Sequence, residues 1–315
     1  MCIFAQPVVS VTDTNIFARL LPGGWQSLVY QMDFASQAKN AIILPIPVQL
    51  PASDEDSLQF ISLKEYDTFF ADLNRLFPLA LPSRPKSRSV SGLAADSAVK
   101  TLRVQEVGDF VASFVPTLSD FHRLDQQFRL PQESWDQIPA YSNYGFAVFQ
   151  LKSLNGKPHP MAFKFKSQLR TTQPKSVFFP TVHIHDGQVH DRERFDHTLY
   201  LQSPDFDQAC GRYIQHGRHV PDSATGYTRS KWAAAHSCDL KKSQGILNAQ
   251  GLVHRHEMRG MFKNTDVVVN GESLRKNAGI PTTNQSLAAL AAAGGFAGMK
   301  WFFDRRKRVA QQEGV

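Results

Sequence analysis

Short apolar runs separated by turn residues fill the start of the chain, over residues 2–48. The runs are rich in Ile, Val and Phe and are too short for helices, a pattern typical of β-strands. Turn residues punctuate them at 12–14 and at 22–24. The block ends with Pro45 and Pro47, which cannot donate backbone hydrogen bonds and therefore belong at the edge or exit of a sheet. The pattern predicts a β-meander.

Further apolar runs predict more strands along the chain, and helical spacing predicts a few helices. The expected strands cover residues 102–116, 145–151, 161–166, 252–258 and 267–269. The expected helices cover residues 63–78, 119–128, 131–138, 204–219 and 229–235. Strands dominate this pattern. The predicted fold class is therefore α+β, with mostly antiparallel or mixed β-sheet and few helices.

The segment 176–200 carries the densest group of side chains that can do chemistry. Apolar strand formers lead into Asp186-Gly187, and such a dipeptide between two β-prone runs is the strongest short hairpin signal. We therefore expect a strand, a two-residue turn and a returning strand. This register places His183 directly opposite His190.

Three histidines of this expected hairpin would project from one face. Residues two apart in a strand share a face, and so do directly paired residues, which places His183, His185 and His190 together. Their β-carbons would lie about 5–7 Å apart, close enough for three imidazoles to bind one ion. Asp186 or His197 could supply a fourth ligand or an acceptor that orients an imidazole. The sequence predicts a site for zinc or another divalent metal; the alternative is a solvated polar face opposite a buried apolar one.

A second His-x-His pair lies further along the chain, at His254 and His256. In a strand these two side chains share one face. They could complete a metal site with the first hairpin, provided that the two strands are neighbours. The alternative is ordinary surface polarity.

Cys2 is a candidate nucleophile of a different kind. Removal of the initiating methionine would expose it as the amino-terminal residue, and its free α-amine could then act as the base for its own thiol. The alternative is a small buried side chain at the start of a strand. Cys210 and Cys238 complete the three cysteines, which are too few and too scattered for a disulfide framework or a zinc knuckle.

Composition and charge indicate an ordinary globular protein. Apolar residues make up 42% of the 315-residue chain and charged residues 20%. The net charge of +7 is modest, and part of it comes from basic residues in 300–315, so the body carries no nucleic-acid signature. The first residues lack the pattern of a signal peptide, and no apolar run reaches the length of about 18 residues expected of a transmembrane helix. These observations predict a cytoplasmic location.

The chain is expected to divide into three parts. Residues 1–203 form a β-rich main domain with a mobile Pro/Ser/Arg-rich loop at 81–100, and 204–283 form its continuation or a smaller subdomain. Residues 284–315 form an Ala-rich and then basic tail. Aromatic residues beside the basic cluster of this tail suit peripheral contact with an anionic membrane; the alternative is a carboxyl-terminal helix packed on the core.

Several short runs in the first 170 residues resemble a bacterial domain-of-unknown-function family with a Cys near the domain start and a meander ending in Leu-Pro-x-Pro. The runs that carry the resemblance are Cys2-x-Phe4 and residues 28–32, 41–47, 107–110 and 145–149. The resemblance implies a fold and no activity. The opening residues also resemble amino-terminal-nucleophile hydrolases, with Arg19 late in the second strand, although Leu20, Leu21 and Pro22 stand where that pattern has an Asp.

These observations lead to two functional hypotheses from different classes. The first is a β-rich binding or scaffold protein that holds a divalent metal at the His-x-His-Asp-Gly hairpin. The second is a cysteine amidohydrolase that uses Cys2. The chain has no glycine-rich phosphate loop, no His-Glu-x-x-His and no Gly-x-Ser-x-Gly, which removes the commonest nucleotide-binding, zincin and hydrolase interpretations.

Overall fold

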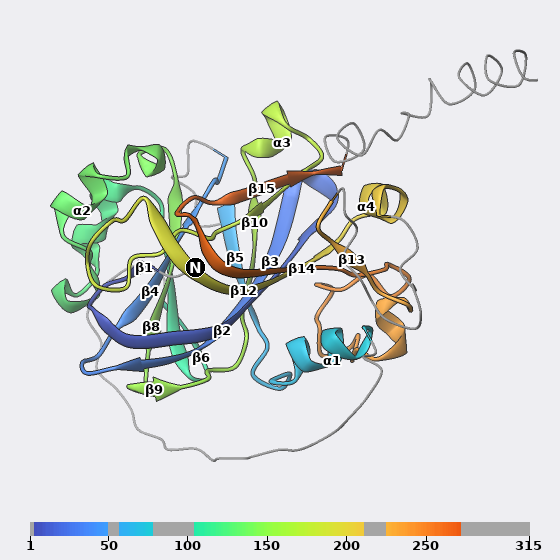
Figure 1. Ribbon diagram of the computed structural model, residues 1–315. Helices are drawn as coiled ribbons and strands as arrows, with labels where there is room; N and C mark the ends of the chain where they lie inside the picture. The colour runs from blue at the N-terminus through green and yellow to red at the C-terminus, as the bar shows by residue number, and fades with distance from the viewer. Residues whose placement is uncertain (1–2, 50–56, 78–103, 211–224, 272–315) are drawn as a thin grey trace, which may run out of the picture.

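Two β-sheets form the body of the molecule, which is a computed structural model that describes residues 3–49, 57–77, 104–210 and 225–271 (Figure 1). One sheet has five strands in the order β1-β4-β8-β7-β6. The other sheet has eight strands among the described residues. Seven follow the order β13-β14-β12-β2-β3-β10-β5, and the eighth, β9, pairs with β3. Strands β11 and β15 form a separate pair, and β15 lies below α3 in the upper part of Figure 1.

The strands are β1 (Ile3–Phe4), β2 (Val8–Leu20), β3 (Trp25–Ser36), β4 (Ala41–Ile46), β5 (Leu58–Ser62), β6 (Val104–Val107), β7 (Phe110–Val115), β8 (Gly145–Leu151), β9 (Asn155–Gly156), β10 (Met161–Lys166), β11 (Ser176–Phe179), β12 (Arg192–Gln202), β13 (Thr228–Arg229), β14 (His254–Lys263) and β15 (Val267–Asn270). The α-helices are α1 (Phe69–Arg75), α2 (Gln132–Asp136), α3 (Leu169–Thr172) and α4 (Pro204–Ala209). Short 3₁₀ helices cover Pro22–Gly24, Leu118–Arg123, Gln126–Phe128, Pro139–Tyr141 and Ala234–His236.

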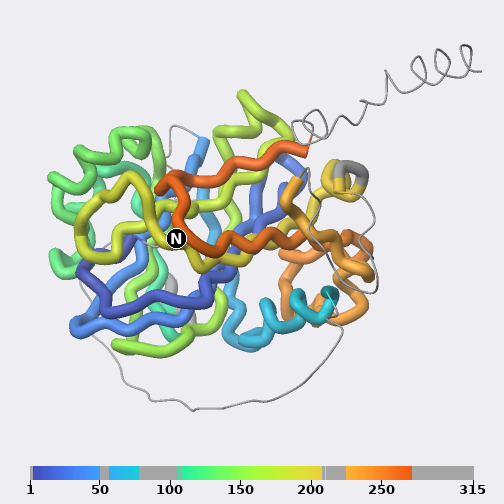
Figure 2. The backbone as a smooth tube through the Cα atoms, in the orientation of Figure 1, coloured from blue at the N-terminus to red at the C-terminus, as the bar shows by residue number. Residues whose placement is uncertain are grey.

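The large sheet is built on the hairpin of β2 and β3. The turn between them contains Gly23 and Gly24, with φ angles of 72° and 81°, a region that side chains other than glycine rarely adopt. Strand β12 then pairs with β2 in parallel, and β14 pairs with β12 in the antiparallel sense. Figure 2 shows the result, in which β2, from the start of the described chain, lies beside β12 and β14, which come from its last third.

Aromatic side chains fill the space between the two sheets. Phe149 on β8 packs edge-to-face against Phe60 of β5, with 5.5 Å between the ring centroids, and also contacts Phe163 of β10 at 6.0 Å. Within its own sheet it contacts Phe110 of β7 at 5.1 Å. All three strands therefore place an aromatic ring against one buried phenylalanine, which joins the five-stranded sheet to the eight-stranded one.

The opposite face of the large sheet is covered by α1 and by residues 232–253. Phe17 and Val29 point to this side and pack with the α1 residues Phe69 and Leu73. Tyr200 on β12 lies in the same cluster. Alternation along the strands explains this second core, because neighbouring residues of β2, such as Ile16 and Phe17, point to opposite faces.

Most predicted strands are confirmed, but the meander is wrong. Strands β8 and β10 have the predicted limits, while residues 8–20 form one continuous strand rather than two. In the meander each strand would pair with the next. Instead, β1 pairs with β4 in one sheet while β2 and β3 belong to the other. The described chain is β-rich, with antiparallel and mixed sheets and few helices, as the predicted fold class requires.

The predicted helices are shorter than expected. The helix expected over 63–78 covers only Phe69–Arg75, and the one expected over 204–219 is seen as Pro204–Ala209, with the rest outside the described residues. The helix predicted at 229–235 is wrong, because Thr228–Arg229 is a strand and Ala234–His236 a 3₁₀ turn. Tertiary pairing with β14 overrides the local pattern there.

The hairpin predicted at 176–200 is also wrong in its pairing. Strand β11 does not pair with the chain that follows Asp186-Gly187 but with β15, where Phe179 lies opposite Val267. The turn at Asp186-Gly187 does form, since the Asp186 carboxylate accepts from the backbone N–H of Gln188 at 3.0 Å and Gly187 has φ of 83°. The residues on its two sides nevertheless belong to a loop, 180–191, and not to a ladder.

The predicted division of the chain stays a prediction. Strands β13, β14 and β15, from the expected second part, pair with β12 and β11 of the first or with one another. The loop at 81–100 and the tail at 284–315 lie outside the described residues, and with them the expected membrane contact. Within the described residues, no helix is long and apolar enough to cross a membrane.

The position of Phe149 yields a stability prediction. Phe149→Ala removes a ring that is fully buried between the two sheets and should lower the free energy of unfolding by about 3–5 kcal/mol. Urea denaturation followed by circular dichroism measures the change. Val9→Ala is the control, because Val9 is 64% exposed and its loss should cost less than about 0.5 kcal/mol. Equal effects of the two substitutions would contradict this account of the core.

Candidate functional site: a buried histidine cluster

The loop 180–191 is fixed on one side by the connection between β14 and β15. The carboxylate of Asp266 accepts hydrogen bonds from the backbone N–H groups of Thr181 at 2.7 Å and Val182 at 3.2 Å. The side chain of Asn264 accepts from the backbone N–H of His183 at 2.7 Å and donates to its carbonyl oxygen at 2.9 Å. The side chains of Asp266 and Asn264 thus bind backbone groups of residues 181–183 that a neighbouring strand would bind in a sheet.

The start of the described chain fixes the other side of the loop. The backbone N–H of Phe4 donates to the carbonyl of Ile184 at 3.1 Å, and that of Val8 donates to His185 at 2.9 Å. Ile3 and Ile184 form a parallel bridge. Ile184 is fully buried as a result, and His183 and His185 are held on its two flanks.

Three imidazoles meet beside this loop and form the histidine cluster, defined as His183, His185 and His197. The ring of His183 stacks on that of His185 with 4.8 Å between centroids and lies at the same distance from that of His197 on β12. The Nε2 atoms of His183 and His197 are 3.1 Å apart, so one of them donates to the other. Phe195, also on β12, stacks on His183 at 4.5 Å.

Burial keeps the three imidazoles neutral. Desolvation lowers the pKa of His183 and of His197 far below the usual value and lowers the pKa of His185 to about 4. The exposed fraction of both His183 and His197 is 2%. At neutral pH the cluster is therefore a set of uncharged rings with nitrogen lone pairs available as acceptors or metal ligands.

Two nitrogens of the cluster are buried without a hydrogen-bond partner among the described residues, namely Nδ1 of His183 and Nε2 of His185. A buried polar atom that lacks a partner costs about 1–3 kcal/mol. Such atoms often mark a place where a ligand or a water molecule binds. The cluster thus has unused binding capacity.

His190 and Asp186 do not join the cluster, so the predicted grouping of His183, His185 and His190 on one face is wrong. His190 is exposed, and its Nε2 lies 3.0 Å from the carboxylate of Asp186. This contact raises the pKa of His190 and lowers the pKa of Asp186. The physical reason is the loop conformation of 180–191, which removes the strand alternation on which the prediction rested.

The second histidine pair, His254 and His256, lies on the neighbouring strand but away from the cluster. Strand β14 is adjacent to β12, and Met258 is the residue opposite His197. His256 donates from Nδ1 to the carbonyl of Gly226 at 2.7 Å. His254 is fully buried and its Nε2 lies 2.8 Å from the carboxylate of Asp207 on α4. Both rings are thus engaged elsewhere.

Sequence reasoning missed the residues that hold the cluster together. Phe195 could have been found, because it precedes His197 by two residues in a strand and must share its face. Asn264 and Asp266 carry no local signal of their role, since both act on backbone groups about 80 positions earlier in the chain. Only the tertiary structure shows these contacts.

As the side chains lie, no group of three or more His, Cys, Asp or Glu residues in the described part of the chain surrounds a position for a metal ion. The predicted zinc or other divalent metal therefore stays a prediction, with a changed set of residues. Cys2, the predicted nucleophile, lies outside the described residues. Cys210 and Cys238 are buried, and burial raises the pKa of Cys238 to about 12.

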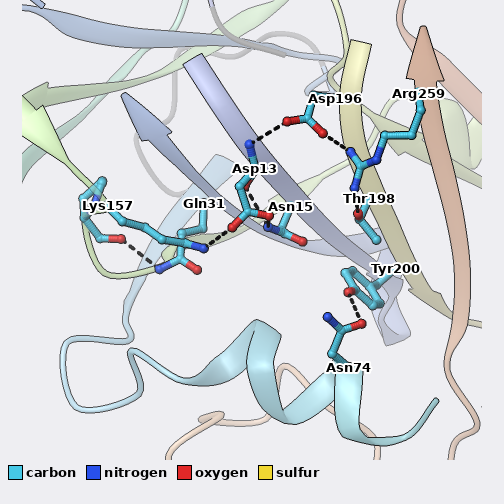
Figure 3. A network of polar contacts seen from close by, with 10 residues as sticks. Asp13, Asn15, Gln31, Asn74, Lys157, Asp196, Thr198, Tyr200 and Arg259 are labelled. Carbon is cyan, nitrogen blue, oxygen red and sulfur yellow. Dashed lines mark hydrogen bonds and ion pairs between the residues drawn. The ribbon is translucent and has the colours of Figure 1, made fainter. Parts of the chain in front are cut away.

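A separate polar network lies on the other face of the large sheet (Figure 3). Asp13 of β2 adopts φ of 50° at a bulge and donates its backbone N–H to Asp196 of β12 at 3.0 Å. Asp196 also pairs with Arg259 of β14, and the carboxylate of Asp13 pairs with Lys157. Because these ion pairs are exposed, each contributes at most about 1 kcal/mol. The network connects three strands at the surface.

Comparison with known proteins identifies no family for this chain. No family model and no curated protein matches it, so the resemblance to a bacterial domain-of-unknown-function family stays a prediction. Among solved structures, the chain is similar to baculovirus P35, with a TM-score of 0.41 and 13% identity over 83% of this chain and 96% of that one.

Two further structures show a comparable likeness. The caspase-8/P35 complex gives a TM-score of 0.40 and 12% identity, covering 82% of this chain and 96% of the other. A mutated baculovirus P35 after caspase cleavage gives 0.38 and 11%, covering 82% and 99%. Similarity at this level assigns no shared activity to this chain.

The buried His254 yields a prediction about pH. Desolvation lowers its pKa, although the nearby Asp207 carboxylate opposes the shift. Below about pH 6.5 the unfolded chain binds a proton on this histidine that the folded chain does not. Stability that is fully present above this pH is therefore lost as the pH falls, by at most about 1.4 kcal/mol per pH unit for one group.

His254→Asn should reduce the difference in the free energy of unfolding between about pH 7.5 and about pH 5.5, relative to the wild type. Chemical denaturation at the two pH values measures it. His236→Asn is the control, because His236 is exposed. An unchanged pH dependence in His254→Asn would show that another group is responsible.

Proposed function

We propose that this chain is a binding protein whose ligand is a divalent metal ion, held by His183, His185 and His197. The observation that carries the proposal is the 3.1 Å separation of the Nε2 atoms of His183 and His197 in a buried site. This set keeps His183 and His185 of the three predicted ligands, includes His197, which the sequence offered as a fourth ligand or an orienting acceptor, and leaves out the exposed His190.

The separation of the two nitrogens supports this ligand. Zinc binds imidazole nitrogen at about 2.0–2.1 Å, so two ligands at a tetrahedral angle lie about 3.3–3.4 Å apart. The observed separation is within a few tenths of an ångström of that value. A small tilt of both rings would direct their lone pairs to one ion in place of the shared proton.

His185 is the third ligand in this proposal. Its ring stacks on His183, and its Nε2 is buried without a partner in the described residues. Rotation about its side-chain bonds would bring this atom toward the other two. His185 is only partly buried and gives the ion a route from solvent. A water molecule would complete a four-coordinate site, as in other sites with three protein ligands.

Protonation and ligand type favour zinc or a neighbouring transition metal. A histidine must be neutral to bind a metal, and burial holds all three imidazoles neutral. Nitrogen-only ligands suit zinc, copper and nickel better than magnesium or calcium, which prefer oxygen. A bound ion would link β12 to the loop 180–191, so its role would be to stabilise this scaffold.

The alternative hypothesis is a cysteine amidohydrolase that uses Cys2. One contact of a described residue favours it: Ile3, the next residue, forms a bridge with Ile184 and so ties the start of the described chain to the fold. In this hypothesis the free α-amine of Cys2 is the base for its own thiol. The two hypotheses differ in the atom that does the chemistry and can be separated by experiment.

Metal binding is tested on protein purified without a His tag and stripped with a chelator. We expect it to bind one Zn²⁺, measured by competition with a chromogenic chelator, and to show the intense visible absorption of tetrahedral Co²⁺. At one hundred times Kd, zinc should stabilise the fold by about 2.7 kcal/mol. His197→Asn should weaken zinc binding by more than about tenfold, because loss of even an outer partner costs that much.

His190→Asn is the matched control and should bind zinc as the wild type does, because His190 lies outside the cluster. Circular dichroism of both variants checks that they fold. If wild-type protein binds no zinc at a free zinc concentration of about 100 µM, which is about 100 times a micromolar Kd, the proposal is overturned. Binding that survives His197→Asn but not His190→Asn would place the metal at a different site.

The Cys2 hypothesis is tested by the rates of labelling with iodoacetamide in the native protein. Cys210 and Cys238 are buried, so both should react far more slowly than they do after denaturation. A nucleophilic Cys2 should react faster than either. Peptide mass mapping reports each rate. Labelling of Cys2 no faster than that of the two buried thiols would leave it without a role as nucleophile.

A further inference from the structure

A groove lies beside β5, the last strand of the large sheet, on the face opposite the histidine cluster. Its floor and walls come from Leu21, Ser27, residues 59–62 of β5, Lys164 of β10 and residues 244–246. We call it the β5 groove. Four consecutive residues of a terminal strand line it, and this strand pairs on one side only, with β10, among the described residues.

One row of paired residues crosses four strands at this place. Arg19 lies opposite Ser27, Ser27 opposite Lys164, and Lys164 opposite Gln59. Directly paired residues share a face, so these polar side chains stand side by side. The next row places Lys166 opposite Trp25, and the ammonium groups of Lys164 and Lys166 lie 5.2 and 5.6 Å from the centre of its ring.

The cations of these two rows have no carboxylate partner in the described part of the chain. None of the ion pairs there includes Arg19, Lys164 or Lys166. Arg19 donates to the carbonyl of Gly245 at 2.8 Å, while its Nε is buried without a hydrogen-bond partner. Among the described residues, three positive charges therefore stand here without a paired carboxylate.

Gln244, on the far wall of the groove, has a strained backbone. Its φ of 49° lies in the left-handed region, which costs a residue other than glycine about 1 kcal/mol or more and is often found at binding sites. This conformation presents its side chain to β5, where its amide donates to the carbonyl oxygen of Ser62. That carbonyl thus accepts from a side chain as it would from the N–H of a further strand.

We propose that the β5 groove binds an acidic segment of another polypeptide in extended conformation. Such a segment would lie along β5 and pair with its backbone, while its carboxylates would reach Lys164 and the neighbouring cations. Leu21, Ile61 and Ile246 offer apolar contacts for side chains between the acidic ones. This proposal is independent of the metal site, which lies on the other face of the sheet.

A polypeptide fits this groove better than a nucleic acid. Binding of a single strand requires several exposed aromatic rings and a long basic track. Phe60 lines the groove but packs against Phe149 and Phe163. Trp25, beside the groove, is already covered by two lysines, and much of the lining is aliphatic or amide. A terminal strand, apolar positions and a few cations are instead the features of peptide recognition by strand addition.

The test uses a fluorescein-labelled, N-acetylated peptide in which valine and glutamate alternate, together with the same peptide carrying glutamine in place of glutamate. Fluorescence anisotropy should show saturable binding of the acidic peptide and at least about tenfold weaker binding of the glutamine peptide. Lys164→Gln should weaken binding of the acidic peptide by about tenfold, and Lys164→Glu should abolish it. Lys263→Gln, an exposed lysine on β14, is the matched control and should bind normally.

Hydrogen exchange gives a second readout, since the bound peptide should slow exchange at amides of β5 and leave those of β9 unchanged. No saturable binding up to about 1 mM, equal binding of the two peptides, or normal binding by Lys164→Glu would overturn the proposal. Tighter binding of a single-stranded oligonucleotide that displaces the acidic peptide would also overturn it and would identify a nucleic-acid groove. Circular dichroism confirms the fold of each variant.

Discussion

The parallel pairing of β12 with β2 is the contact on which the rest of the structure depends. Residues from His197 to Gln202 lie along residues from Thr14 to Arg19, joining segments about 180 positions apart. Strand β14 can enter the large sheet only because β12 is already there. A parallel ladder of this kind needs a long connection, and the intervening chain supplies β4, β6, β7 and β8, four of the strands of the five-stranded sheet.

The same ladder positions both proposed binding sites. His197 pairs with Thr14 on the inner face of the sheet, where the histidine cluster forms. Arg19, on the outer face at the other end of β2, belongs to the row that crosses the β5 groove. One strand pair thus fixes two groups of side chains on opposite faces, and changes in one group can be made without touching the other.

Local sequence patterns predicted single elements well and their partners badly. Strands β8 and β10 could be delimited because their apolar runs are bounded by turn residues. The turn at Asp186-Gly187 was also predictable, since it depends on a short side-chain contact. Local patterns could not predict that β11 would pair with β15 rather than with the segment after Asp186-Gly187. The reason is that strand propensity does not specify which distant strand supplies the hydrogen bonds.

The candidate site shows the same limit. His183 and His185 were recognised from their spacing, but His197 was given only a supporting role because its strand was expected as the return arm of a hairpin. Burial determines which histidines form the cluster. His190 is exposed beside Asp186, whereas His197 is buried. Residue type indicates what a side chain can bind, and the tertiary structure determines which side chains meet.

The pairing of Ile3 and Phe4 has a consequence for how the chain folds during synthesis. These residues lie between β4 and Ile184, so they are synthesised long before all of their neighbours exist. Strand β2 likewise keeps one edge open until Gln202 has been made. Contacts so distant in sequence slow folding, and open strand edges invite pairing between chains. Strands β1 and β2 must therefore stay unassociated with other chains until residues 184–202 have been translated.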